Sequence, residues 1–427
     1  MYKYIVEGGF PVKGKIKPSG NKNAALPCLA ATLLTEEPVF LKNVPDLEDV
    51  QVMIEILQCL GSTVERISKN EYKIQTTDIK RNDIPSELAS KVRASILFAG
   101  PLLARLGKVI LPPPGGDVIG RRRLDTHFLV LKELGAQISI DGQFIFQANK
   151  LIGREIFLDE ASVTATENAI MASVLADGET ILCNAASEPH VQDLCRMLNL
   201  MEANISGIGS NILRIKGVKK LSGAEMTIGA DFMEVGSLIG LAAVTHGELE
   251  ILDAAPAHHR MTKIAFGKLG ISWETNGNTI KVHAGQELKV VPDVGGMIPK
   301  IDDAPWPGFP PDLISIALVV ATQVQGTILL HEKMFESRMF YVDKLIGMGA
   351  KIVLCDPHRA VVVGPSRLQG SEVVSPDVRA GMALLIAALC AEGESTIHNV
   401  YQIERGYENI TTRLTSLGAK ISRVKDV

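Results

Sequence analysis

Six cationic side chains stand at the edges of long apolar segments of this chain. They are Lys22, Arg93, Arg122, Arg338, Arg379 and Arg405. Guanidinium groups match the oxygen atoms of phosphates and carboxylates in a fixed fork, and the N–H groups that open a helix attract anions. If the fold brings these edges together, the cations would hold a small substrate with several negative charges.

Two carboxylates occupy similar positions. Asp117 lies in the Pro- and Gly-rich segment 112–120, just before three consecutive arginines, and Asp312 follows two prolines at the start of an apolar stretch. Among convergent cations, one carboxyl group could donate a proton and the other accept one. Singly, each has an ordinary explanation. The arginine run could be a solvated loop, and a carboxylate at a helix start stabilises it by about 0.3–1 kcal/mol.

The elements that must position these side chains follow a repeat. A block of apolar helix, short strand, second helix and two-stranded hairpin recurs six times at intervals of roughly 70 residues, which indicates one supersecondary unit used repeatedly. In the first block, apolar periodicity and alternation predict helices over 24–34 and 46–60, with strands over 38–41, 63–67 and 72–75.

The first helix of each block is apolar on nearly every side. In the later blocks these helices are expected over 94–106, 166–176, 235–244, 313–324 and 378–391. A helix that is apolar all round must be buried. We therefore expect an α/β fold of two domains with three units each, in which helices face inward and sheets outward. One domain would span 22–229 and include Asp117. The other would combine 1–21, recruited as a strand, with 230–427, and the cations would line the cleft between the domains.

The composition excludes several classes of protein. With 46% apolar and 22% charged residues and a net charge of −4, the chain can bury large cores and has no global attraction to nucleic acid or anionic membranes. Its six cysteines lack metal-ligand spacing, so we expect free thiols in a reducing compartment. We find neither a signal peptide nor an apolar run of the ~20 residues that a membrane helix needs, and we expect a cytoplasmic protein.

Six motifs, in order along essentially the whole chain, resemble those of the enolpyruvyl transferases. They are 19–27, 92–95, 115–120, 309–312, 335–338 and 404–408. The resemblance is closer to the branch that acts on UDP-sugars than to the branch that acts on shikimate 3-phosphate. It implies an inside-out α/β barrel of six βαβαββ units. It also implies addition–elimination, in which phosphoenolpyruvate gives its enolpyruvyl group to the 3-hydroxyl of UDP-N-acetylglucosamine and phosphate leaves, a step of peptidoglycan precursor synthesis.

The resemblance also implies roles for individual residues. Asp312 would be the base near the attacking hydroxyl, and Asp117 stands where most members carry the cysteine taken as the general acid. Lys22, Arg122 and Arg405 would hold phosphoenolpyruvate. The remaining substrate-binding residues would be Asn23, Arg93, Leu124, Asp125, Ser162, Val163, Met334, Arg338 and Arg379. No metal, other cofactor, nucleic acid or membrane is implied, and we expect a monomer.

Four positions depart from the family pattern. Asp117 replaces the cysteine that fosfomycin alkylates, and a carboxylate is a poorer nucleophile than a thiolate, so we expect insensitivity to fosfomycin. Arg123, Glu160 and Phe232 stand where a Pro, a Lys and an Arg are usual. These departures leave open another nucleotide or nucleotide sugar as acceptor. A non-catalytic, nucleotide-sugar-binding repeat protein is a further alternative.

Overall fold

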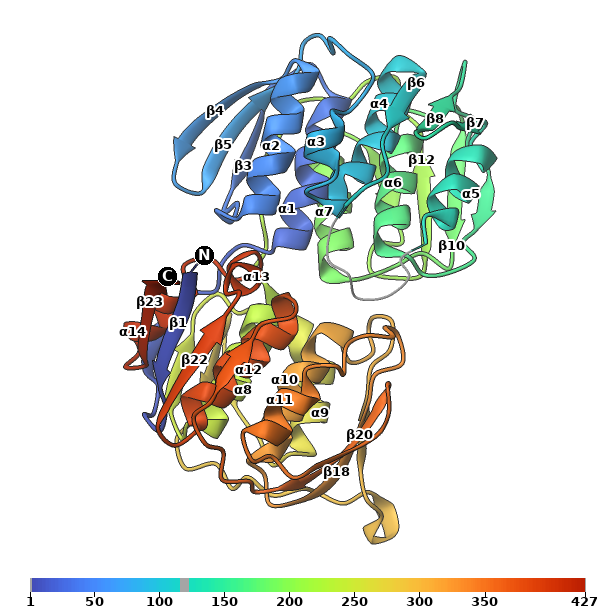
Figure 1. Cartoon of the computed structure of the whole chain (residues 1–427). Coiled ribbons are helices and arrows are strands. Elements are labelled where there is room, and N and C mark those ends of the chain that lie inside the picture. Colours follow the sequence, from blue (N-terminus) through green and yellow to red (C-terminus); the bar gives the residue numbers. More distant parts are fainter. Residues whose placement is uncertain (1, 116–122, 427) are drawn as a thin grey trace. The chain divides into compact units, whose positions relative to one another are not determined.

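The computed structural model describes residues 2–115 and 123–426. The described chain divides into two compact units (Figure 1). Met1–Ser19 and Ala230–Val427 make one, called here the discontinuous unit, and the described residues of 20–229 make the other, called the continuous unit. Over the described ranges, no helix has the length and apolar character needed to cross a membrane.

The continuous unit alternates helices with short strands. Its helices are α1 (Lys22–Ala31), η1 (Thr32–Leu34), α2 (Glu48–Leu60), α3 (Ser86–Ala89), η2 (Arg93–Phe98), α4 (Ala99–Leu106), α5 (Asp125–Glu133), α6 (Val163–Ser173) and α7 (Pro189–Leu200). Its strands are β3 (Val39–Lys42), β4 (Thr63–Ser68), β5 (Glu71–Gln75), β6 (Lys108–Leu111), β7 (Gln137–Ile140), β8 (Phe144–Gln147), β9 (Glu155–Phe157), β10 (Glu179–Cys183), β11 (Asn204–Ser206), β12 (Ile212–Lys216) and β13 (Glu225–Thr227).

The discontinuous unit repeats this alternation. Its helices are α8 (Phe232–Val244), η3 (Pro256–His259), α9 (Arg260–Gly267), η4 (Val294–Gly296), η5 (Pro311–Leu313), α10 (Ile314–Thr322), α11 (Val342–Gly347), α12 (Val378–Cys390), α13 (Tyr401–Glu404) and α14 (Ile410–Thr415). Its strands are β1 (Tyr2–Glu7), β2 (Lys13–Ile16), β14 (Glu248–Ile251), β15 (Glu274–Asn276), β16 (Thr279–Val282), β17 (Lys300–Asp302), β18 (Gly326–His331), β19 (Ile352–Asp356), β20 (Arg359–Gly364), β21 (Glu372–Val374), β22 (Glu394–His398) and β23 (Lys420–Lys425).

In each unit, some neighbouring strands of a sheet are far apart in the sequence. The described strands form the sheets β13-β3-β5-β4, β6-β8-β7 and β11-β12-β10-β9 in one unit, and β21-β22-β1-β23, β15-β16-β14-β2 and β17-β18-β20-β19 in the other. β13 runs parallel to β3, with Met226 opposite Leu41, and β2 runs parallel to β14. The N-terminal residues, expected as one strand, therefore supply β1 and β2 to two different sheets.

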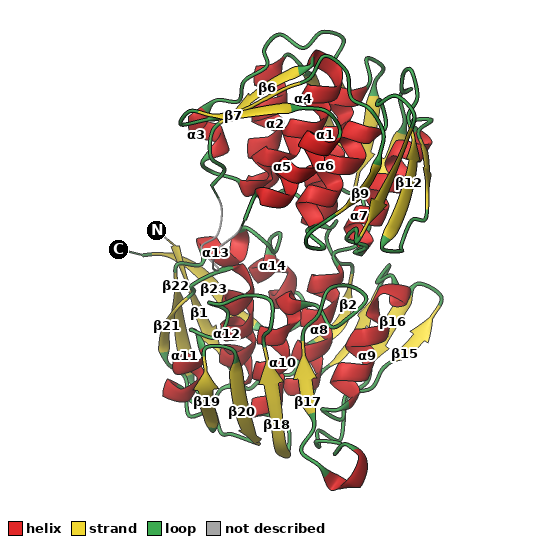
Figure 2. Cartoon of the chain, turned by 90° about the vertical axis from the view of Figure 1, so that its right-hand side faces the viewer, coloured by secondary structure: helices red, strands yellow, loops and turns green. Residues whose placement is uncertain are grey.

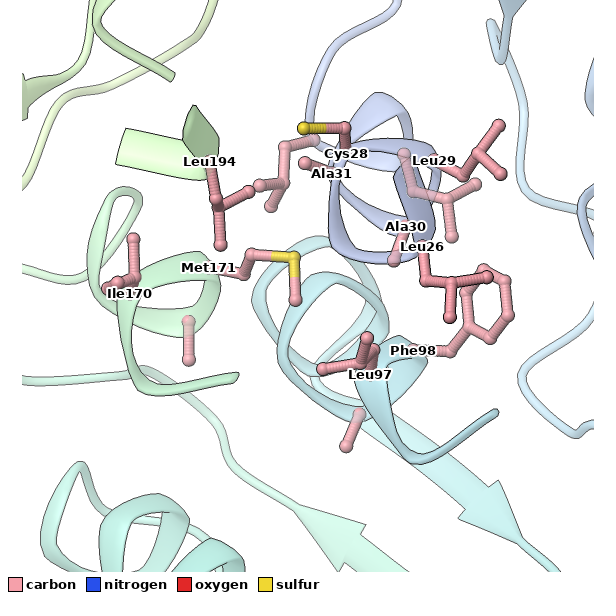
Figure 3. Packing of buried hydrophobic residues seen from close by; sticks show 14 of the residues in the cluster. Leu26, Cys28, Leu29, Ala30, Ala31, Leu97, Phe98, Ile170, Met171 and Leu194 are labelled. Atoms are coloured by element: carbon pink, nitrogen blue, oxygen red, sulfur yellow. The ribbon is translucent and has the colours of Figure 1, made fainter. Parts of the chain in front are cut away.

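Central helices fill both units, with sheets around them (Figure 2). In the continuous unit, Leu26 and Leu29 of α1 pack beside Leu97 and Phe98 of η2 and Met171 of α6 (Figure 3). In the discontinuous unit, every residue of α8 and α10 is buried. The expected α/β fold with inward helices is thus confirmed. Two expected helices begin or end differently, because Arg93–Phe98 and Thr32–Leu34 are 3-10 turns.

Candidate active site

In the discontinuous unit, two arginines hold the carboxylate of Asp312. Arg338 Nη2 donates to Asp312 Oδ1 at 2.6 Å, and Arg379 Nε donates to Asp312 Oδ2 at 2.8 Å. Asp312 lies in η5, Arg338 precedes α11, and Arg379 lies in the first turn of α12. Both arginine side chains are less than a tenth exposed, whereas that of Asp312 is 21% exposed. Asp312 is therefore a partly exposed carboxylate held by two buried arginines.

Arg379 keeps its charge despite its burial. Burial opposes the charge, but Tyr407, Asp312 and Asp231 hold the pKa of the Arg379 guanidinium well above its ordinary value. Its Cζ lies 5.4 Å from the ring centroid of Tyr407, whose hydroxyl lies 3.1 Å from Ser237 Oγ. Arg379 Nη1 is buried without a hydrogen-bond partner among the described residues. A guanidinium with an unused donor suits an anionic ligand.

Asp377 positions both Arg379 and Arg338. It is the N-cap of α12, and its Oδ1 accepts from the N–H groups of Arg379 and Ala380 at 2.8 and 3.0 Å. The same oxygen lies 3.8 Å from Arg338 Nη1. A capped first turn fixes where the next side chains point, so this aspartate aims the pair of arginines at Asp312.

Two more predicted residues of this unit differ in exposure. Arg405 follows α13 and is 8% exposed, next to the buried Tyr407 and Glu408. Met334 is 41% exposed, and its N–H donates to Asp303 Oδ2 at 3.2 Å. The backbone of Met334 is thus held in place while its thioether side chain stays half-exposed. This side chain is available for apolar contact with a planar ring.

In the continuous unit, Lys22 opens α1 and pairs with Asp49. The distance from Lys22 Nζ to Asp49 Oδ2 is 2.9 Å, and the two side chains are 13% and 8% exposed. Asn21 caps the helix, its Oδ1 accepting from the N–H groups of Asn23 and Ala24. Lys22 and Asn23 thus lie at the N-terminus of a buried helix, where the helix dipole also favours negative charge.

A buried imidazole joins the starts of α5 and α6, where four predicted nucleotide-binding residues lie. His127 Nε2 is 3.0 Å from Thr164 Oγ1, and its Nδ1 accepts from the amide of Asn168 at 2.9 Å. Burial, with a smaller effect of Arg93, lowers the pKa of His127 to about 3, so the ring stays neutral. The link brings the N-cap residues of both helices and the residues after them to one region: Leu124, Asp125, Ser162 and Val163.

The departures from the family pattern have distinct surroundings. Arg123 is exposed and pairs with Asp125 at 3.1 Å and with Asp159 at 3.3 Å, and Arg93 Nη2 donates to the Arg123 carbonyl at 3.1 Å. Glu160 is exposed. Phe232 is 2% exposed, and its ring centroid lies 5.7 Å from that of Trp306. Phe232 is therefore a core residue of its own unit.

The structure unites the predicted residues in two groups. Asp312, Arg338 and Arg379 are in contact in one unit, and in the other His127 ties the nucleotide group together while Lys22 pairs with Asp49. Asp117 and Arg122 lie outside the described residues. Sequence reasoning missed Asp49, Asp303, Glu332 and Asp377. For Asp377 a signal existed, since an aspartate directly before an apolar helix is a typical N-cap. In the described part of the chain, no cluster of His, Cys, Asp or Glu could hold a metal ion.

Comparisons with known proteins identify relatives over the full length. Residues 6–414 match the family described as EPSP synthase (3-phosphoshikimate 1-carboxyvinyltransferase). The chain is 67% identical to the UDP-N-acetylglucosamine 1-carboxyvinyltransferase of Treponema denticola over 99% of each chain. It is 60% identical to the enzyme of the same name from Borreliella burgdorferi over 100% of each chain.

Solved structures share the fold at low sequence identity. The enolpyruvyl transferase NikO from Streptomyces tendae superposes with a TM-score of 0.87 at 21% identity, covering 100% of this chain and 99% of that one. EPSP synthase from Acinetobacter baumannii gives 0.78 at 17% identity, covering 100% of both chains. These neighbours confirm the inside-out α/β fold.

Proposed function

The chain belongs to the EPSP synthase family of enolpyruvyl transferases, and from this premise we infer that it transfers the enolpyruvyl group of phosphoenolpyruvate to the 3-hydroxyl of UDP-N-acetylglucosamine. The observation that supports this acceptor most strongly is the full-length identity of 60–67% to enzymes of that name. The contacts of Asp312 with Arg338 and Arg379 support the catalysis, because they place a carboxylate among cations.

We propose that the reaction proceeds by addition and elimination. In the first step Asp312 takes the proton of the sugar hydroxyl, and the hydroxyl oxygen forms a bond to C2 of phosphoenolpyruvate. The methylene carbon of phosphoenolpyruvate takes a proton from Asp117. In the second step the Asp117 carboxylate takes a proton back from the new methyl group, the double bond returns, and the C–O bond to phosphate breaks, so that inorganic phosphate leaves with the electron pair of that bond. Lys22, Arg122 and Arg405 neutralise the phosphate and carboxylate charges through both steps.

The arginine contacts affect the strength of this base. Both oxygens of Asp312 accept from guanidinium groups, and each keeps a second lone pair that can take a proton, but the two positive charges disfavour protonation of the carboxylate. Arg379 already has a buried donor without a partner among the described residues. We propose that the anionic substrates draw one arginine away from Asp312 and thereby strengthen the base.

A panel of acceptors tests this proposal. Phosphate release is measured with phosphoenolpyruvate and, in separate reactions, UDP-N-acetylglucosamine, UDP-glucose, UDP alone and shikimate 3-phosphate. We expect release with UDP-N-acetylglucosamine, absent when phosphoenolpyruvate is omitted. Faster release with another nucleotide would reassign the acceptor. The exposed Arg123, which pairs with Asp125 and Asp159, is the reason to include other nucleotides in the panel. Binding of UDP-N-acetylglucosamine without any release would indicate a non-catalytic binding protein.

A further inference from the structure

We propose that Asp303 and Glu332 form a carboxyl pair that shares one proton and holds the segment 333–338 in the geometry needed for substrate binding. The functional part of this inference rests on the proposed function. Its structural part does not, and the two can be tested separately.

The two carboxyl groups meet at the same edge of one sheet. Asp303 follows β17 and Glu332 follows β18, which run parallel with Asp302 opposite His331. The next residues of the two strands therefore come side by side. Both side chains are 0% exposed. Two carboxyl groups buried at such close range cannot both ionise without strong repulsion.

The hydrogen bonds around the pair leave a place for one proton. Asp303 accepts from the N–H groups of Lys333 at 2.5 Å and Met334 at 3.2 Å. Glu332 Oε1 accepts from the N–H of Phe335 at 3.2 Å. Its Oε2 is buried and receives no hydrogen bond from a donor of the described residues, and the register of β17 and β18 places Asp303 beside Glu332. A proton on Glu332 Oε2 could be donated to the carboxyl of Asp303, which would give this buried oxygen a hydrogen-bond partner.

The surroundings favour the protonated pair. The titratable and charged groups that act on Glu332 or contact it come from several elements: Asp303, Asp312, Arg338, Tyr341 and His358. Burial comes first and Asp303 second in raising the pKa of Glu332 to about 9, while Arg338 opposes them. At neutral pH the pair therefore keeps its proton. Above about pH 9 Glu332 becomes a charged group inside the protein.

The pair acts on the site through the backbone that it holds. Its three N–H partners are Lys333, Met334 and Phe335. Arg338, which donates to Asp312, follows three residues after Phe335. Arg338 Cζ also lies 5.1 Å from the ring centroid of Phe335. Loss of the proton would add a buried negative charge beside Asp303, and the repulsion between the two groups would displace the segment that carries Met334 and Arg338. Asp303 and Glu332 are thus positioning residues.

Glu332→Gln provides the sharpest test, because an amide mimics the protonated carboxyl. Its NH₂ can donate to Asp303 and its oxygen can accept from Phe335. Glu332→Ala removes both contacts. Asp302→Asn is the matched control, since Asp302 is adjacent to the pair but bonds instead to the outer side chains Lys300 and Lys333.

Amide hydrogen exchange of the ligand-free protein tests the structural part. Wild type and E332Q are compared at equal pH, so that the intrinsic pH dependence of exchange cancels. We expect the protection of residues 333–335 in wild type to fall relative to E332Q by up to about tenfold for each pH unit between about pH 5 and 9, where the opened segment releases the proton that the closed segment keeps, and to level off above pH 9. D302N should follow wild type. Two results would contradict a shared proton between Asp303 and Glu332. One is loss of protection in E332Q at a lower pH than in wild type, and the other is identical profiles for the two proteins at every pH.

Kinetics test the functional part. The KM for UDP-N-acetylglucosamine should rise above pH 9 in wild type and stay flat in E332Q, with E332A raised at every pH. A wild-type rise that persists unchanged in E332Q would remove the positioning role. If no acceptor supports phosphate release while the exchange result holds, the proposed function fails and the carboxyl pair stands.

Discussion

At the residue scale, the contacts of Asp312 set what this carboxylate can do. It is the most exposed member of its ion-paired group, and both of its oxygens are held by arginines on different elements. Charge-assisted bonds of this kind orient a carboxylate more firmly than solvent does. Anionic substrates that compete for the two arginines would make Asp312 a stronger base, which links proton transfer to occupancy of the site.

Replacement of this base should affect turnover far more than binding. We expect Asp312→Asn to lower kcat by about 10²–10⁴-fold, the usual contribution of a positioned general base, while the Kd for UDP-N-acetylglucosamine stays within a few-fold. Phosphate release and calorimetric titration measure the two quantities. D302N should match wild type in both. A kcat for D312N within tenfold of wild type would exclude the base role.

The identity of residue 117 should decide the response to fosfomycin. With Asp117 we expect no time-dependent inactivation, because a carboxylate attacks the epoxide far more slowly than a thiolate does. Asp117→Cys should introduce inactivation together with a mass increase of one inhibitor molecule on that residue. Mass spectrometry of the intact protein reads this out. Rapid covalent inactivation of the unmodified protein would contradict the expectation.

At the element scale, buried polar residues align helices that are otherwise apolar. Asn168 on α6 is 0% exposed, and its amide donates to the carbonyl of Ile96 at 2.8 Å and to His127 Nδ1 at 2.9 Å. Its Oδ1 accepts from Gly100 N at 2.8 Å. One side chain thus ties η2, α4, α5 and α6 together. Apolar packing alone would tolerate several rotations of these helices, and the amide selects one.

Loss of this amide should be costly for folding. Asn168→Ala leaves buried partners without hydrogen bonds, each costing about 1–3 kcal/mol, so we expect the free energy of unfolding to fall by about 3 kcal/mol or more. Urea denaturation followed by circular dichroism measures this change. The exposed Asn149→Ala should change it by less than about 0.5 kcal/mol. A loss below 1 kcal/mol for N168A would mean that water or repacking replaces the amide.

The carboxyl pair also predicts a pH dependence of stability. The pKa of Glu332 is raised from an ordinary 4.5 to about 9 in the folded protein, so folding favours the protonated form. Its stabilising contribution is complete below about pH 4.5 and is lost progressively as the pH rises toward 9. We expect the difference in unfolding free energy between E332Q and wild type to grow over this window. If this difference did not change with pH, the pKa of Glu332 would not be raised in the folded protein.

At the scale of the whole molecule, the proposed reaction requires residues of both units. Lys22 belongs to the continuous unit, and Arg405 and Asp312 belong to the discontinuous unit. The chain passes between the units at Ser19–Gly20 and at Gly229–Ala230. Among the described residues these are the two points at which the chain changes unit, and such connections can serve as a hinge. We propose that substrates bound by residues of both units shift the chain toward a closed, more compact state.

Small-angle X-ray scattering tests this closure. We expect the radius of gyration to decrease when UDP-N-acetylglucosamine is added, because contacts with both units favour a compact state. In Lys22→Ala the subsequent response to phosphoenolpyruvate should be weaker. UDP alone, which lacks the sugar, serves as the control ligand. An unchanged radius at saturating UDP-N-acetylglucosamine, with binding verified by calorimetry, would argue against a hinge.

The sequence alone determined the repeated block, the buried helices and the family, because these depend on local periodicity and on motif order. The burial of α8 and α10 and the strands β3, β4 and β5 follow the predicted pattern within a few residues. The 3-10 geometry of Arg93–Phe98 did not, since hydrophobic periodicity does not distinguish one kind of helical turn from another.

Only the tertiary structure decided which charged groups meet. Arg338 and Arg379 lie 26 and 67 residues from the Asp312 that they hold, Lys22 lies 27 residues from Asp49, and the pairing of Asp303 with Glu332 follows from the register of β17 and β18. An ion pair or a shared proton requires atoms within a few ångströms. Those distances depend on how strands and helices pack, which residue type and spacing do not specify.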